Sequence, residues 1–339
     1  MSLPFVESHL KPILKSNGFK MQWCNFPDPL IVILGPTAVG KTELSIRLAE
    51  ALNGEIISAD SRLFYRGMDI GTAKPTRAEM LRVPHHLIDV CDPDETWSLA
   101  VFQRAAQEAI RDIHSRNKLP LLVGGTGQYV RAVIEGWQIP AQQPDPRLRQ
   151  ALEKWAVEIG PDEMHRRLAL IDPVAAGRIL PGNVRRTIRA LEVIFNTGRR
   201  FDEQRTKGGS PFSLLMLGLK RPRAEIYARV DARIEAMLKD GMLDEVRGLL
   251  AKGYSADLPS MSAIGYREMT DVVQGKMTLD EAVTEMKSLT HQFVRRQANW
   301  FKETDPDIHW FNAAEDCLPQ MITLIQSGQG WLPRSRTEE

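Results

Sequence analysis

Short, mostly apolar segments alternate with longer amphipathic ones in the first part of the chain. Segments of about four to eight residues that end in glycine, proline or charged residues predict buried strands. Two longer segments, Lys41–Leu52 and Ser98–Asn117, carry apolar residues at helical spacing. Because strands that alternate with helices build parallel sheets, we predict an α/β fold with a mostly parallel, doubly wound sheet. The predicted strands are Leu30–Leu34, Gly54–Ala59, His85–Val90 and Leu119–Val123.

The alternation of strands and helices stops near residue 142. Helical spacing without a strand continues to about Gly209, and strand character returns at Ser213–Leu219. We therefore predict a catalytic core of residues 29–142 and 210–330, interrupted by a helical insertion domain at residues 143–209. Residues 1–28 precede the first strand and are expected to form a peripheral N-terminal extension. Beyond the insertion we predict helices at Arg223–Lys239 and Leu279–Lys302 and a last short strand at Ile308–Asn312.

The composition is that of a globular protein with balanced charge. A chain of 339 residues is long enough for two domains, and 43% hydrophobic with 26% charged residues is ordinary for a soluble fold. The 44 basic and 43 acidic residues give a net charge of +1. A polyanionic partner would therefore have to be bound by a local basic patch.

Cellular location is constrained by what the sequence lacks. No apolar run reaches the ~18–20 residues of a membrane span, and the N-terminus lacks the apolar core of a secretory signal. Cys24, Cys91 and Cys317 are few, odd in number and widely spaced, which argues against a disulfide framework and a zinc site. We expect a cytoplasmic protein without a membrane partner.

The segment Leu30–Thr42, LIVILGPTAVGKT, carries the strongest chemical signal. Its Gly-x-x-x-x-Gly-Lys-Thr pattern between a strand and a helix is typical of a phosphate-binding loop (P-loop). Glycines let backbone N–H groups converge on an anion, Lys41 adds positive charge, and the Thr42 hydroxyl can hold Mg²⁺. The alternative is a tight turn without a ligand. The residues expected to hold a di- or triphosphate are Gly35, Pro36, Thr37, Ala38, Val39, Gly40, Lys41 and Thr42.

Asp60 is the candidate for acid–base chemistry. Hydrolytic enzymes with such a loop usually place a Mg²⁺-binding aspartate at the end of an apolar strand, whereas Leu119–Val123 is followed by Gly-Gly-Thr. Asp60 follows the strand Gly54–Ala59 and should lie near the loop. Its carboxylate could bind Mg²⁺ through water or accept a proton from a nucleophile. The simpler alternative is a loop or helix-capping aspartate.

Two later segments are locally basic. Arg178–Lys207 holds eight basic and three acidic residues, and Arg295–Lys302 interleaves basic with aromatic residues. Such runs are often solvated helix faces, but Arg and aromatic clusters also suit the phosphates and unpaired bases of RNA. Charge alone does not decide between the two interpretations.

Several longer motifs resemble the tRNA dimethylallyltransferase family, also called isopentenyl-tRNA transferases. The segment ISADSRLFYRGMDIGTAKP is the most specific, and the resemblance extends over about residues 30 to 312. The matching segments are Gly35–Thr42, Ile57–Pro75, Pro84–Val90, Leu121–Ala132, Asp172–Ile179, Arg189–Val193, Arg223/Arg229/Arg233, Ile264–Glu268 and Arg295–Phe301.

The resemblance implies a reaction and a set of roles. Dimethylallyl diphosphate would donate its five-carbon group to N6 of the adenosine 3′ to the anticodon (position 37), and pyrophosphate would leave. Asp60 is then expected to be the general base, and Thr42 to bind Mg²⁺ and the diphosphate. Lys41 and Arg233 are expected to neutralise the charge that grows on the leaving group.

The resemblance also implies a tRNA-binding surface for the anticodon stem-loop, with the target base leaving its stack. We expect the enzyme to act as a monomer. The residues expected to contact tRNA are Asp60, Ser61, Arg62, Leu63, Thr126, Arg185, Arg186, Thr187, Ile188, Arg189, Ser262, Ala263, Ile264, Gly265, Tyr266, Arg267, Arg295, Arg296, Gln297, Trp300 and Lys302.

Two features depart from the family pattern. Gly127-Gln128-Tyr129 stands where many members have Met-Leu-Tyr, which is expected to alter the lining of the prenyl pocket. The C-terminal region has no Cys/His pairing like the zinc finger of eukaryotic members, so the chain is similar to the bacterial form. The alternatives are a kinase that uses the same loop, a nucleotide-switch or RNA-binding protein without chemistry, and an adenylate prenyltransferase. The helical insertion and the Arg295–Lys302 cluster disfavour the last.

Overall fold

The computed structural model describes residues 25–139, 145–204 and 208–335. Most of the predicted N-terminal extension, Cys24 and the predicted junction at residues 142 and 143 lie outside these residues. The chain divides into two compact units. Of the described residues, the first unit comprises 25–134 and 210–335, and the second comprises 135–139, 145–204, 208 and 209. The predicted insertion domain starts later, at residue 143, and ends at the same residue 209.

The first unit is built on one sheet of six strands, all parallel, in the order β3-β2-β4-β1-β5-β6. β1 lies in the interior, where Ile31 is opposite both Leu121 of β4 and Leu215 of β5. This parallel α/β sheet confirms the predicted fold class. The strands are β1 Pro29–Leu34, β2 Gly54–Ser58, β3 His85–His86, β4 Leu119–Gly124, β5 Ser213–Lys220 and β6 Ile308–Asn312.

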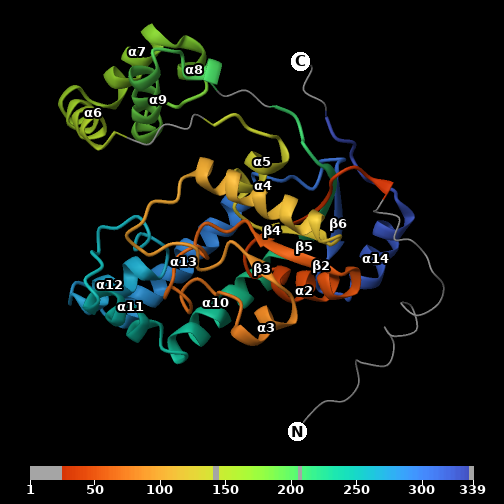
Figure 1. The fold of residues 1–339 in the computed structure, drawn as a ribbon. Coiled ribbons are helices and arrows are strands. Elements are labelled where there is room, and N and C mark those ends of the chain that lie inside the picture. Colours follow the sequence, from red (N-terminus) through yellow and green to blue (C-terminus); the bar gives the residue numbers. More distant parts are fainter. Residues whose placement is uncertain (1–24, 140–144, 205–207, 336–339) are drawn as a thin grey trace. The chain divides into compact units, whose positions relative to one another are not determined.

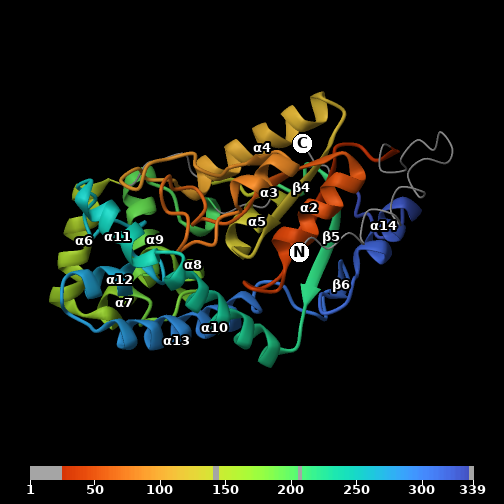
Figure 2. The same ribbon diagram turned by 90° about the horizontal axis from the view of Figure 1, so that it is seen from below.

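Helices cover both faces of the sheet (Figures 1 and 2). Alternate residues of β1 enter opposite cores. Ile31 and Ile33 pack with α2 and α14, and Leu30 and Val32 pack with α4, α5 and α10 to α13. α10 and α13 lie side by side in both views. The helices are α2 Lys41–Leu52, α3 Arg77–Arg82, α4 Leu99–Ser115, α5 Gly127–Ile134, α10 Arg223–Lys239, α11 Met242–Ala251, α12 Tyr266–Val273, α13 Leu279–Gln297 and α14 Leu318–Ser327.

Two predicted elements were too long. The strand expected at His85–Val90 is only His85–His86, because Leu87 and Asp89 take left-handed backbone conformations with φ of 62° and 54°. The helix expected to reach Lys302 ends at Gln297. Its last turn tightens, since the Trp300 N–H bonds to the carbonyl of Gln297 three residues back.

The second unit is helical and has a core of its own. Asp145 caps its first helix, with Pro146 at the first helical position, as is usual for a helix start. Asp172 is fully buried and accepts hydrogen bonds from the N–H groups of Ala175 and Asp202. It therefore links the turns that contain these two residues. The unit comprises α6 Pro146–Ile159, α7 Pro161–Ile171, α8 Pro173–Gly177, α9 Val184–Thr197 and a short 3₁₀ helix, Asp202–Gln204 (Figure 1).

None of the helices within the described residues combines the length and apolarity that crossing a membrane requires.

Candidate active site at the phosphate loop

The loop between β1 and α2 has the backbone that an anion site needs. Gly35 and Gly40 have φ of 151° and 112°, which side chains other than glycine rarely adopt. A Cβ at Gly35 would lie 2.8 Å from the Leu219 carbonyl of β5, so the loop passes too close to the neighbouring strand for a side chain. The loop leads directly into the N-terminus of α2, where the helix dipole favours an anion.

Three side chains from distant parts of the chain hold the backbone of this loop. The Nε atoms of Arg229 and Arg221 donate to the carbonyls of Ala38 and Val39 at 2.8 and 2.9 Å. The Gln297 amide oxygen accepts the Thr37 N–H at 2.9 Å. The arginines bind two of the loop's carbonyl oxygens. Those oxygens are therefore less free to accept from the loop N–H groups that an anion would use.

Lys41 lies inside the loop and donates from Nζ to the carbonyls of Gly35 and Pro36 at 2.9 and 2.8 Å. Burial lowers the pKa of Lys41, the Asp60 carboxylate opposes this shift and the Arg233 charge adds to it, with a resulting pKa of about 8. Burial, followed by repulsion from Arg229, lowers the Arg233 pKa as well. Lys41 is therefore close enough to both Asp60 and Arg233 to interact with them electrostatically.

Asp60 and Thr126 follow neighbouring strands. The Ala59 N–H donates to the Val123 carbonyl at 2.8 Å, which joins the end of β2 to the end of β4. The Asp60 Oδ1 atom accepts the Arg62 N–H at 3.0 Å and so organises the first turn of the following loop. Both residues thus lie at the carboxyl edge of the sheet, where ligands bind in open α/β folds.

Aromatic side chains form an apolar cluster near Asp60. Tyr129 packs against Phe64 and Phe102, with ring centroids 5.8 and 4.7 Å apart. Burial, with smaller contributions from charges that include Asp60, raises the Tyr129 pKa to about 12. Tyr129 is thus part of the apolar packing that surrounds this end of the sheet.

The loop of residues 61–75 is held by two charged side chains, the buried Lys74 and the half-buried Glu245. The Lys74 ammonium is 4% exposed and contacts the Tyr65 carbonyl, Asp69 and Asp89 at 2.8, 2.5 and 2.5 Å. Glu245 of α11 accepts the N–H groups of residues 69, 70 and 71 at 2.9, 2.8 and 3.2 Å and the Tyr266 hydroxyl at 2.5 Å.

Half of the residues of the predicted tRNA-binding segment Ser262–Arg267 are buried and support this loop from the protein interior. Tyr266 is fully buried, and Ala263 and Gly265 are buried as well. Ile264 is half-buried, and only Ser262 and Arg267 are exposed. The backbone before this segment also contacts the loop, since the Arg62 guanidinium donates to the Pro259 carbonyl at 3.2 Å.

The predicted tRNA residues in the last turn of α13 and just after it separate into two groups. Arg295, Arg296, Trp300 and Lys302 are exposed, whereas Gln297 is buried and directed at the phosphate loop. In the helical unit, Arg185 and Arg186 are exposed on α9. Thr187 and Ile188 are buried, with Ile188 in the unit's core, and Arg189 pairs with the buried Glu192 at 2.9 Å.

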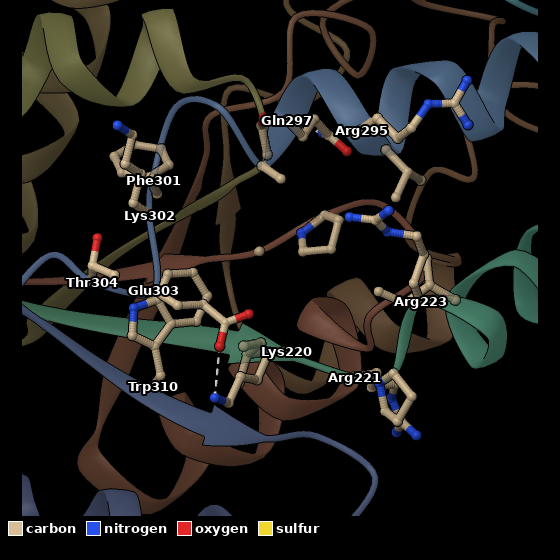
Figure 3. Close-up of a pocket in the computed structure, with 18 residues that line it drawn as sticks. Lys220, Arg221, Arg223, Arg295, Gln297, Phe301, Lys302, Glu303, Thr304 and Trp310 are labelled. Atoms are coloured by element: carbon tan, nitrogen blue, oxygen red, sulfur yellow. Dashed lines mark hydrogen bonds and ion pairs between the residues drawn. The ribbon is translucent and has the colours of Figure 1, made fainter.

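A cavity of about 600 Å³ adjoins the first residues of the phosphate loop (Figure 3). Gly35, Pro36 and Gly125 form one side of it. Aliphatic, aromatic and charged side chains line the remainder, and Lys220 is paired with Glu303 at 2.7 Å. Among the lining residues are Ile226, Phe301, Trp310, Arg223, Arg295 and Lys302.

The oxygen donors at the loop are suited to Mg²⁺. Thr42 is exposed in the first turn of α2, and Asp60 follows β2 at the same edge of the sheet. Within the described residues no group of three His, Cys, Asp or Glu side chains could hold a metal by itself. Mg²⁺ in phosphate sites usually takes only one or two protein oxygens, with water and phosphate supplying the others, so this donor set fits.

Several residues that shape the site were given no role from the sequence, although Arg229 and Lys74 lie in motifs that resemble the family. Arg229 stands four residues before Arg233, and this helical spacing was a signal that both side chains lie on one face of α10. Arg221, Lys74 and Glu245 carried no such signal. Their partners are backbone groups or side chains that local sequence does not identify.

Comparisons with known proteins agree with this site. The family model described as IPP transferase matches residues 63–304, and that described as isopentenyl transferase matches residues 29–90. The tRNA dimethylallyltransferase of Roseiflexus castenholzii is 58% identical over 307 residues, covering 91% of this chain and 96% of its own. That of Roseiflexus sp. strain RS-1 is 54% identical, covering 88% of this chain and 98% of its own.

Solved structures give the same result. The tRNA isopentenylpyrophosphate transferase of Bacillus halodurans is 43% identical with a TM-score of 0.65, covering 89% of this chain and 95% of its own. A eukaryotic dimethylallyltransferase acting on tRNA is 30% identical with a TM-score of 0.72, covering 84% of this chain and 74% of its own. From its phosphate loop to the segment after α13, the chain belongs to the tRNA dimethylallyltransferase family of prenyltransferases.

Proposed function

We propose that this chain transfers the dimethylallyl group of dimethylallyl diphosphate to N6 of adenosine 37 in tRNA and releases pyrophosphate. The observation that carries the proposal is the grouping of Lys41, Arg233 and Asp60 at one phosphate loop. Two cations suit a diphosphate, and the carboxylate beside them suits a proton acceptor. We propose that the enzyme works as a cytoplasmic monomer.

The donor would bind with its diphosphate in the loop of residues 35–42. Lys41 and Arg233 then lie against oxygens whose negative charge increases as the C–O bond breaks, so they stabilise the transition state more than the bound donor. Thr42 would hold Mg²⁺, which would supply further charge neutralisation when bound.

The acceptor base would enter between Asp60 and Thr126. The N6 nitrogen attacks C1 of the dimethylallyl group, the C1–O bond breaks, and its electron pair leaves with pyrophosphate. The proton from N6 passes to the Asp60 carboxylate. Ser61, Arg62 and Leu63, in the loop that Lys74 and Glu245 fasten, would contact the flipped nucleoside.

The exposed basic residues would bind the anticodon stem-loop through its phosphates. Arg295, Arg296 and Lys302 follow one another at the end of α13, with Trp300 exposed among them to stack on an unpaired base. On the helical unit, Arg185 and Arg186 present two more cations.

The proposal is tested by incubating the protein with Mg²⁺, dimethylallyl diphosphate and unmodified tRNA, followed by mass spectrometry of the nucleosides. Prenylated adenosine and released pyrophosphate are the expected products. Phosphate transfer from ATP to an acceptor would instead favour a kinase. Tight tRNA binding without prenylated adenosine would favour a binding protein.

A further inference from the structure

Gln297 has a different environment from the other residues of its basic segment. It is the last residue of α13, is 9% exposed, and directs its side chain into the protein. Its Oε1 atom accepts the Thr37 N–H at 2.9 Å, and its Nε2 atom donates to the Gly125 carbonyl at 3.1 Å. Because the amide has one donor end and one acceptor end, these two partners allow only one orientation of the group.

The backbone around Gln297 leaves room for this contact. A Cβ at Gly125 would lie 2.4 Å from the Gln297 Nε2 atom, so a side chain there would displace the amide. A Cβ at Gly127 would lie 2.2 Å from the Trp300 ring, and Arg131 of α5 donates to the Trp300 carbonyl at 2.8 Å. The segment after α13 is thus closely packed against the turn that follows β4.

The two partners of Gln297 belong to the sites of two different substrates. Thr37 lies in the loop that would hold the diphosphate of the donor. Gly125 directly precedes Thr126, which would contact the acceptor base. We infer that Gln297 is a positioning residue that fixes the distance between the donor and acceptor sites; this rests on the proposed function.

This role has a specific kinetic consequence. Prenyl transfer needs C1 and N6 close together and aligned, and a displacement of ~1 Å can cost on the order of 10²-fold in rate. The groups that bind each substrate are elsewhere, since Lys41 and Arg233 serve the diphosphate and exposed arginines serve the tRNA. Removing the amide should therefore slow the transfer step without weakening either substrate.

The first test replaces Gln297 by methionine, which has a similar size but makes neither hydrogen bond. We expect the single-turnover rate at saturating substrates to fall ~10- to 100-fold. The affinities for pyrophosphate and tRNA should stay within about threefold of wild type. Gln292→Met is the matched control, because Gln292 is exposed on the same helix and should leave all three quantities unchanged.

A second variant, Gln297→Glu, gives a readout that general destabilisation would not produce. A protonated carboxyl group can accept from Thr37 and donate to Gly125 as the amide does, whereas a carboxylate would repel the Gly125 carbonyl. Burial raises a carboxyl pKa, so the rate of this variant relative to wild type should recover as the pH falls from about 7 to 5. This variant also decides the question if Gln297→Met fails to fold.

Three outcomes would overturn the inference. They are a wild-type rate for Gln297→Met, a loss of pyrophosphate affinity that accounts for its slower rate, and a pH-independent relative rate for Gln297→Glu. If wild-type protein itself prenylates no tRNA in the same assay, the proposed function fails instead, so the two failures are distinguishable.

Discussion

At the scale of single residues, Asp60 is expected to be the proton acceptor. Asp60→Asn keeps the size of the side chain and its contact to the Arg62 N–H but removes the base. Loss of a positioned general base costs typically ~10²–10⁴-fold, so single-turnover transfer should fall by that factor. Pyrophosphate affinity measured by calorimetry should change little. A variant with more than about half of the wild-type rate would exclude Asp60 from this role.

The lowered pKa of Lys41 predicts how donor binding depends on pH. Its pKa in the free protein is lowered to about 8, and only the protonated form attracts a diphosphate. Above about pH 8, Lys41 must first take up a proton before the diphosphate binds. Pyrophosphate affinity should therefore fall by up to about tenfold per pH unit. In Lys41→Arg the charge persists to higher pH. The ratio of the pyrophosphate affinities of wild type and this variant therefore isolates the titration of Lys41 from the titration of pyrophosphate itself. A ratio that does not change between about pH 7 and 10 would contradict the prediction.

At the scale of elements, the loop of residues 61–75 depends on Glu245 of α11. Glu245→Ala would leave three backbone N–H groups and the buried Tyr266 hydroxyl without their acceptor. Tyr266 is fully buried and the three N–H groups are at least partly exposed. An unpaired buried group costs ~1–3 kcal/mol, so the free energy of unfolding in urea should fall by about 2 kcal/mol. Glu245→Gln retains one acceptor oxygen and should lose less.

Asp244→Ala is the matched control for Glu245. Asp244 is the adjacent residue, is 79% exposed and pairs only with the exposed Arg247 at 2.8 Å among the described residues, so its loss should cost under about 1 kcal/mol. Equal effects of Asp244→Ala and Glu245→Ala would show that Glu245 does not anchor the loop.

At the scale of the whole molecule, the helical unit is expected to grip tRNA. Each phosphate contact releases counterions, so Arg185→Ala with Arg186→Ala should weaken tRNA binding and reduce its salt slope by about one unit per lost contact. Pyrophosphate affinity should not change. Binding of the anticodon stem-loop at several salt concentrations measures both quantities.

The control belongs to the same unit. Arg166 and Arg167 are exposed but both pair with Glu163, so their replacement by alanine should leave the salt slope nearly unchanged. Arg189 is left in place, because its loss would leave the buried Glu192 carboxylate without its arginine. If the variant of Arg185 and Arg186 keeps the wild-type salt slope, this basic surface is a solvated helix face, which is the alternative that the charge pattern left open.

The sequence by itself determined the elements and the type of loop, because their causes are local. Hydrophobic spacing and helix starts placed α2 and α10 at their observed bounds and identified all six strands of the sheet, with β3 predicted too long. The Gly-x-x-x-x-Gly-Lys-Thr pattern located the phosphate loop, whose glycines have the positive φ angles that this turn requires. The longer motifs identified the family, which the comparisons confirm.

Only the tertiary structure decided which distant residues meet. β3 stops after His86 because Asp89 turns to Lys74 and to the Leu63 carbonyl, partners that an apolar pattern does not reveal. Glu245 and Gln297 resemble any surface glutamate or glutamine in the sequence. Their roles come from backbone groups at residues 69 to 71 and at Thr37, which lie far along the chain and meet them only when the helices have packed on the sheet.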